Sequence, residues 1–187
     1  LVNSGQIIGD VDLGNHDDTY DGQLGSVAGE VYGWDGNDTL NGGASNDVFF
    51  GENGNDTLNG GGGADRLDGG DGIDLAAYTS SSVGVGIDML TALYSGPDAQ
   101  GDVFVNIEGV SGSAFADTLA GDNFDNLLRG MAGADTLLGR DGNDSIEGGA
   151  GADFIDGGSG ADTLEGGDGA DTIDGGSGID FAAYSKA

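Results

Sequence analysis

Aspartate is the residue whose type and spacing could do chemistry in this chain. When residues 33–77 and 112–183 are cut into blocks of nine, the sixth position holds Asp in all but one block. Carboxylates that recur in register and stack on each other repel unless a cation lies between them. The strongest candidates for cation ligands are Asp38, Asp56, Asp65, Asp74, Asp135, Asp144, Asp153, Asp162, Asp171 and Asp180.

Glycines accompany these aspartates at fixed positions. The first position of all thirteen nonads is Gly, and the fourth is Gly in ten of them. Glycine permits positive φ, so the chain can turn tightly and present backbone carbonyls to a ligand. The candidate ligands among the fourth-position glycines are Gly36, Gly54, Gly133, Gly142, Gly151, Gly160, Gly169 and Gly178.

The eighth position predicts the elements that hold these loops. It is a large apolar residue in eleven of the thirteen nonads. In a short strand at positions seven to nine, alternation turns the eighth side chain to one side. Nine residues are too few for a full turn around a core, so two nonads make one turn of eighteen. The sequence therefore predicts an all-β fold of two parallel sheets that face each other across one apolar row.

Calcium is the cation that this ligand set favours. Carboxylates and carbonyls suit its coordination by about six to eight oxygens, whereas magnesium requires a stricter octahedron. Transition metals prefer His or Cys, which the nonads lack. Stacking pairs each Asp with the one eighteen residues later, which gives six sites with both loops intact and at most nine. The intact pairs are Asp38–Asp56, Asp56–Asp74, Asp135–Asp153, Asp144–Asp162, Asp153–Asp171 and Asp162–Asp180.

Three loops depart from the pattern and yield weaker candidates. The fourth-position Gly is replaced by Ser45, Phe115 and Phe124, and the last of these loops also holds Asn126 in place of Asp. Asp47 and Asp117 are therefore weaker ligands. Residues 13–21 look like a decayed nonad, which makes Asp18 a further weak candidate, with the single His of the chain where a loop Gly would be.

The nonads closely resemble the GGxGxDxUx calcium-binding repeat of RTX (repeats-in-toxin, hemolysin-type) proteins, a pattern associated with the parallel β-helix. The resemblance covers residues 33–77 and 112–183. It implies a right-handed parallel β-roll with calcium between successive loops, held by the sixth-position Asp and loop carbonyls. It also implies secretion: export of the unfolded chain by type I secretion machinery, followed by folding on extracellular calcium.

Composition excludes several other functions. With 34 acidic residues against 4 Lys plus Arg, the formal net charge is −30, so no cationic face exists for nucleic acid. The absence of Cys excludes a thiol nucleophile, and no apolar run approaches the ~20 residues of a membrane span. We expect no enzymatic activity, because a catalytic carboxylate pair occurs once whereas these pairs recur.

The chain divides into five segments by this pattern. Divergent turns occupy 1–32, nonads fill 33–77 and 112–183, non-repeat β turns occupy 78–111, and 184–187 begin a further interrupted unit. Strands are expected at 78–82, 83–90 and 103–110, with a hydrophobic capping or coupling role. The chain is expected to belong to a larger polypeptide. The alternative functions are a carrier module of an exported enzyme (a protease, lipase or alginate epimerase) and a structural adhesin or surface-layer segment.

Overall fold

The computed structural model describes residues 1–183, and these form twenty-three strands joined by turns without a helix. Residues 1–183 accordingly contain no helix with the length and apolar character of a membrane span. The chain folds as two compact units, which are described separately. The first unit holds residues 1–78 and 97–107, and the second holds 79–96 and the chain from 108 onward.

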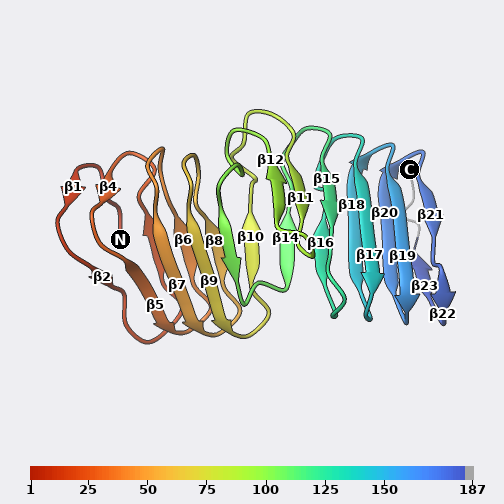
Figure 1. The fold of residues 1–187 in the computed structure, drawn as a ribbon, viewed down its shortest axis with the longest axis horizontal. Helices are drawn as coiled ribbons and strands as arrows, with labels where there is room; N and C mark the ends of the chain where they lie inside the picture. The colour runs from red at the N-terminus through yellow and green to blue at the C-terminus, as the bar shows by residue number, and fades with distance from the viewer. Residues whose placement is uncertain (184–187) are drawn as a thin grey trace. The chain divides into compact units, whose positions relative to one another are not determined.

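The first unit is built from parallel strands that lie side by side (Figure 1). A small pair consists of β1 (Gln6–Ile7) and β4 (Ser26–Val27). One sheet contains β3 (Thr19–Asp21), β6 (Thr39–Asn41), β8 (Thr57–Asn59) and β10 (Leu75–Ala77). The other contains β2 (Val11–Asp12), β5 (Val31–Asp35), β7 (Val48–Asn53), β9 (Arg66–Asp71) and β13 (Val103–Val105).

The second unit repeats this architecture. One sheet contains β14 (Gly109–Ser111), β16 (Leu127–Arg129), β18 (Ser145–Gly151), β20 (Thr163–Gly169) and β23 (Phe181–Ala183). The other contains β11 (Gly86–Asp88), β15 (Thr118–Ala120), β17 (Thr136–Asp141), β19 (Phe154–Gly160), β21 (Thr172–Asp174) and β22 (Ser177–Gly178). An antiparallel strand, β12 (Leu93–Ser95), pairs with β11.

The strand register follows the predicted turn of eighteen residues. Leu40 pairs with Leu58 in the first unit, and Leu137 pairs with Ile155 in the second. Because the side-chain period of a strand is two, this register places equivalent residues of successive turns on the same face. The predicted all-β parallel β-roll is confirmed.

The core is the row of eighth-position side chains. Leu40, Phe49, Leu58 and Leu67 are fully buried in the first unit, as are their counterparts from Leu119 to Leu164 in the second. Tyr20 extends the row into residues 13–21 and packs edge to face on Phe49 of the opposite sheet, with ring centroids 6.0 Å apart. The core thus lies between the two sheets of each unit, as predicted.

The non-repeat segment differs from its expected strands. Residues 78–85 contain no strand, and β11 begins only at Gly86, so the strand expected at 78–82 is wrong. The span 103–110 is broken at Asn106, whose φ is +48, between β13 and β14. Isolated β-branched residues favour strands only weakly, and tertiary pairing decides. The unit expected to begin at 184–187 lies outside the described residues.

Candidate metal centre

The sixth-position aspartates form ladders along the edges of the rolls. At each step, the backbone N–H of one Asp donates to Oδ1 of the Asp one turn later, with N to O distances of 2.7–3.1 Å. The ladders of the first unit are Asp18–Asp38–Asp56–Asp74 and Asp47–Asp65. Those of the second unit are Asp117–Asp135–Asp153–Asp171 and Asn126–Asp144–Asp162–Asp180.

The second carboxylate oxygen is buried without a hydrogen-bond partner in eight of these aspartates in the described chain. Each of these residues is at most 2% exposed. A buried carboxylate oxygen that lacks a partner costs free energy, and a bound cation removes that cost. The eight residues are Asp38, Asp56, Asp65, Asp74, Asp135, Asp144, Asp153 and Asp162.

The space beside each unpartnered oxygen is open because the first position is Gly. A Cβ on Gly130 would lie 2.5 Å from Asp135 Oδ2 and 2.5 Å from the carbonyl oxygen of Gly148, one turn later. A side chain would therefore fill the gap between a carboxylate and a carbonyl. The same arrangement recurs at Gly33, Gly51, Gly139, Gly148 and Gly157. These oxygens match the hard ligands that calcium prefers, so the residues fit this ion.

The fourth-position glycines shape the loops. All eight predicted candidates have φ between +124° and +151°, a range that other residues rarely adopt. The backbone carbonyl of the residue one turn earlier approaches each of them closely; the carbonyl oxygen of Gly133, for example, would collide with a Cβ on Gly151. The predicted glycines thus allow successive loops to stack at backbone distance: Gly36, Gly54, Gly133, Gly142, Gly151, Gly160, Gly169 and Gly178.

In the three departing loops, the sixth side chain accepts a hydrogen bond from its own loop. In each, the N–H of the second residue donates to the sixth side chain: Gly43 to Asp47 Oδ2 at 3.1 Å, and Ser113 to Asp117 Oδ2 at 2.6 Å. In the ten loops with Gly at position four, the second residue has positive φ instead, even where it is Trp34. Replacement of the fourth Gly therefore accompanies a conformation in which the protein itself satisfies the carboxylate.

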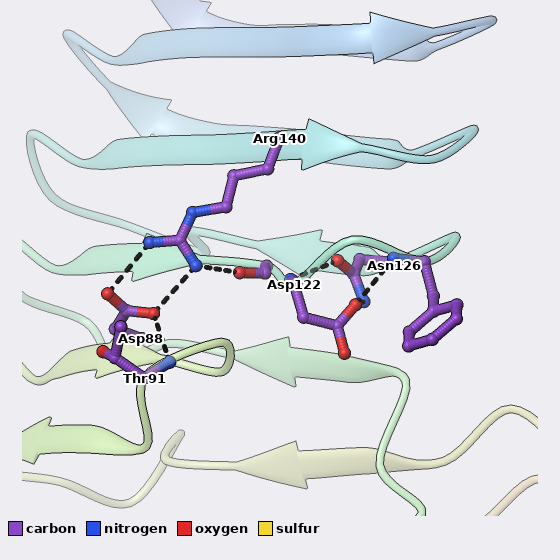
Figure 2. A network of polar contacts seen from close by, with 7 residues as sticks. Asp88, Thr91, Asp122, Asn126 and Arg140 are labelled. Carbon is purple, nitrogen blue, oxygen red and sulfur yellow. Dashed lines mark hydrogen bonds and ion pairs between the residues drawn. The ribbon is translucent and has the colours of Figure 1, made fainter.

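The loop that begins at Gly121 has a protein cation beside it (Figure 2). The Asp122 N–H donates to Asn126 Oδ1 at 2.8 Å, which uses the oxygen that would face a metal. Arg140, one turn later, donates to the Gly121 carbonyl and forms two hydrogen bonds of 2.8 and 2.9 Å with Asp88. Arg140 lowers the pKa of Asp88 to about 2. Here the positive charge beside the loop comes from a guanidinium of the protein itself.

Burial makes ionisation of four loop carboxylates unfavourable. It is the largest cause that raises the pKa of Asp56, Asp135 and Asp144 to about 6, with smaller contributions from neighbouring aspartates. The pKa of Asp65 is raised to about 7 by burial and by Asp102, Asp47 and Asp98. Carboxylates whose charge is unfavourable in the metal-free fold are suited to a cation that restores it.

The remaining predicted ligands lie in the same ladders but are less enclosed. Asp171 and Asp180 accept the ladder bond on the last described turns and are half-buried. Asp18 donates to Asp38 and is also half-buried, while the adjacent His16 has a φ of +108 at the expected glycine position. Among residues 1–183, no three His, Cys, Asp or Glu side chains converge into a metal site. The backbone carbonyls beside the aspartates are further oxygen ligands that an ion could use.

Sequence reasoning missed Asp102. It accepts the Asp65 N–H at 2.9 Å and so continues a ladder of the first unit, although it lies 37 residues later rather than 18. The signal in the sequence is an Asp two residues before an apolar residue, Phe104, without glycine at the first, second and fourth positions of a nonad. The register of β13 on β9 brings it into place.

Comparison with known families agrees with this geometry. A model of the RTX calcium-binding nonapeptide repeat matches four times, at residues 30–49, 41–76, 111–146 and 147–182. No curated protein matches the chain. The four matches cover more than half of the sequence and contain all twelve aspartates that form the ladders within the two nonad blocks, together with their glycines. Repeats of this family bind calcium in general, and this chain belongs to the RTX calcium-binding nonapeptide repeat family.

Proposed function

We propose that this chain is a calcium-dependent folding module in which six loop pairs each bind one calcium ion. The observation that carries the proposal is the distribution of unpartnered Oδ2 atoms. They occur in loops with Gly at position four, whereas Asp47 and Asp117, in departing loops, receive an N–H from their own loop. In each of the six pairs, the aspartate that comes first along the chain has such an unpartnered oxygen: Asp38, Asp56, Asp135, Asp144, Asp153 and Asp162.

The two aspartates of each pair have different roles. In Asp135–Asp153, the Oδ1 of Asp153 accepts the Asp135 N–H at 2.9 Å and fixes the spacing of the loops. The Oδ2 of Asp135 then faces the Gly148 carbonyl of the next turn. A bound calcium ion supplies positive charge between these oxygens. Occupation of six sites changes the formal charge from −30 to −18.

Without calcium, the chain's own residues oppose folding. One apolar side chain per nonad forms a thin core, whereas ordering costs about 1–2 kcal/mol per residue and most for Gly. Stacked carboxylates add repulsion. At cytosolic calcium the chain therefore stays extended, and at millimolar calcium, sites with Kd of about 10⁻⁴–10⁻³ M fill and the roll closes.

This switch fits a secreted, extracellular protein of bacteria. An extended chain can pass through type I secretion machinery, and folding outside the cell prevents its return. The module itself carries out no reaction; it serves a larger polypeptide as a folding and export segment. The family match supports this role, since its repeats are calcium-binding elements rather than an enzyme fold.

Equilibrium dialysis against calcium tests the proposal. We expect at least six calcium ions per chain, with magnesium at the same concentration unable to displace them. Binding of fewer than three ions, or equal binding of magnesium, contradicts the assignment. A variant that combines Asp47→Asn with Asp117→Asn is the matched control, because those loops satisfy their own carboxylates and the count should not change.

A further inference from the structure

Two of the eight unpartnered carboxylate oxygens belong to aspartates that are not the first member of any of the six pairs. They belong to Asp65 and Asp74, in the last two nonad loops of the first unit. No nonad follows them directly, because the non-repeat segment comes next and the second nonad block begins only at Gly112. The residues that cover these loops come from the non-repeat segment, because β13 pairs in parallel with β9.

Asp65 and Asp102 make the same contact as the two aspartates of an intact pair, with Asp65 in the donating position and Asp102 in the accepting position. The Asp65 N–H donates to Asp102 Oδ1 at 2.9 Å, within the range of the nonad ladders. Phe104 pairs with Leu67 in the register that eighth-position residues use elsewhere. Asp102 is 7% exposed, so it is buried, as most ladder residues of the repeats are.

Asp65 supplies the unpartnered oxygen of this pair. The residue is 1% exposed, and its Oδ2 has no hydrogen-bond partner and faces the open side of Gly60. The charges of Asp102, Asp47 and Asp98 all act on this carboxylate and oppose its ionisation. A single divalent cation removes both the unsatisfied oxygen and the repulsion.

Tyr78 marks the end of this ladder. Its hydroxyl donates to Asp102 Oδ2 at 2.7 Å, so the second oxygen of Asp102 has a protein partner where a continuing ladder would leave it free. Asp74, in contrast, faces the backbone carbonyl of Asn106. The two carboxylates of the Asp65–Asp102 pair therefore attract a divalent cation more strongly than the carboxylate and carbonyl at Asp74 do.

We propose that Asp65 and Asp102 form a calcium site outside the repeat pattern, in which the non-repeat segment supplies one of the two carboxylates. The site rests on the proposed function of the repeats. It gives residues 97–107 a direct role: their return to the first unit is fixed by metal binding as well as by strand pairing. The non-repeat segment is then a calcium-dependent part of the roll rather than only a hydrophobic cap.

Calcium counting on the full chain tests this site. Asp102→Asn removes one charge but keeps a side-chain oxygen that can accept the Asp65 N–H. We expect equilibrium dialysis to find one calcium ion fewer than in the wild type. Asp71→Asn is the matched control, since Asp71 is exposed on the same unit, and its count should not change.

Terbium luminescence gives a second measurement that does not depend on the count. Tyr78 lies against Asp102, so a terbium ion in the site is sensitised by its ring. Tyr78→Phe should lower the emission excited through tyrosine while the number of bound ions stays the same. An unchanged count in Asp102→Asn, or unchanged emission in Tyr78→Phe, overturns the site. A wild-type chain that binds no calcium overturns the function of the repeats instead.

Discussion

One ladder of the second unit contains three aspartates that differ in how many intact pairs they join. Asp153 joins two pairs, with Asp135 and with Asp171, and Asp135 joins one. Asp117 joins none, because the Ser113 N–H satisfies its Oδ2. We predict that replacement of each by Asn destabilises the calcium-saturated protein in this order.

The magnitude follows from linkage between binding and folding. Asn keeps an oxygen that accepts the N–H of the preceding turn, so the replacement removes charge and leaves the ladder bond. A site at a hundredfold excess of calcium over Kd adds about 2.7 kcal/mol. The free energy of unfolding should therefore fall by about 5 kcal/mol in Asp153→Asn and by about 2.7 kcal/mol in Asp135→Asn. Asp117→Asn should lower it by about 1 kcal/mol, through weaker hydrogen bonds.

Urea unfolding followed by far-UV circular dichroism measures these differences in saturating calcium. The same variants in chelator serve as the control, where removal of a buried charge should not destabilise Asp153→Asn. Equal losses in the three variants, or the largest loss in Asp117→Asn, would refute the pairing of loops eighteen residues apart.

Three further predictions concern pH, loop conformation and the departing loop. Because the folded pKa of Asp65 is raised from 3.8 to about 7, stability of the chelated chain is highest below about pH 4 and falls as pH rises through 7; its β signal should be stronger at pH 5 than at pH 8. Gly151→Ala should lower the thermal midpoint sharply, since its conformation costs about 1–3 kcal/mol before the clash with a backbone carbonyl; Gly5→Ala, in open space, should leave it unchanged. A triple replacement that restores the repeat should add one bound calcium in equilibrium dialysis: Phe124→Gly, Asn126→Asp and Arg140→Gly.

The sequence alone predicts the fold because each nonad repeats the same local physics. The apolar eighth position fixes which face is buried, and a nine-residue period fixes the register, as the pairing of Leu40 with Leu58 confirms. Substitutions at the fourth position also mark the loops in which the sixth side chain accepts an N–H from its own loop. The ladder bond itself, from a backbone N–H to Oδ1, was not predictable, because it depends on how far apart the stacked loops settle.

The non-repeat segment shows where sequence reasoning fails. Asp102 reaches Asp65 only because the chain leaves the first unit at Tyr78 and returns at Pro97. Such a return depends on tertiary pairing between β13 and β9, which no local pattern encodes. The ion pair between Arg140 and Asp88 is likewise a contact over 52 residues.

Far-UV circular dichroism of the chain, during a calcium titration that starts in chelator, tests the central claim most directly. Calcium-dependent folding predicts a weak β signal in chelator and a cooperative gain with calcium, without a comparable gain in magnesium. A full β signal already present in chelator at neutral pH would contradict it, because the thin core and stacked carboxylates would then fold without the cation.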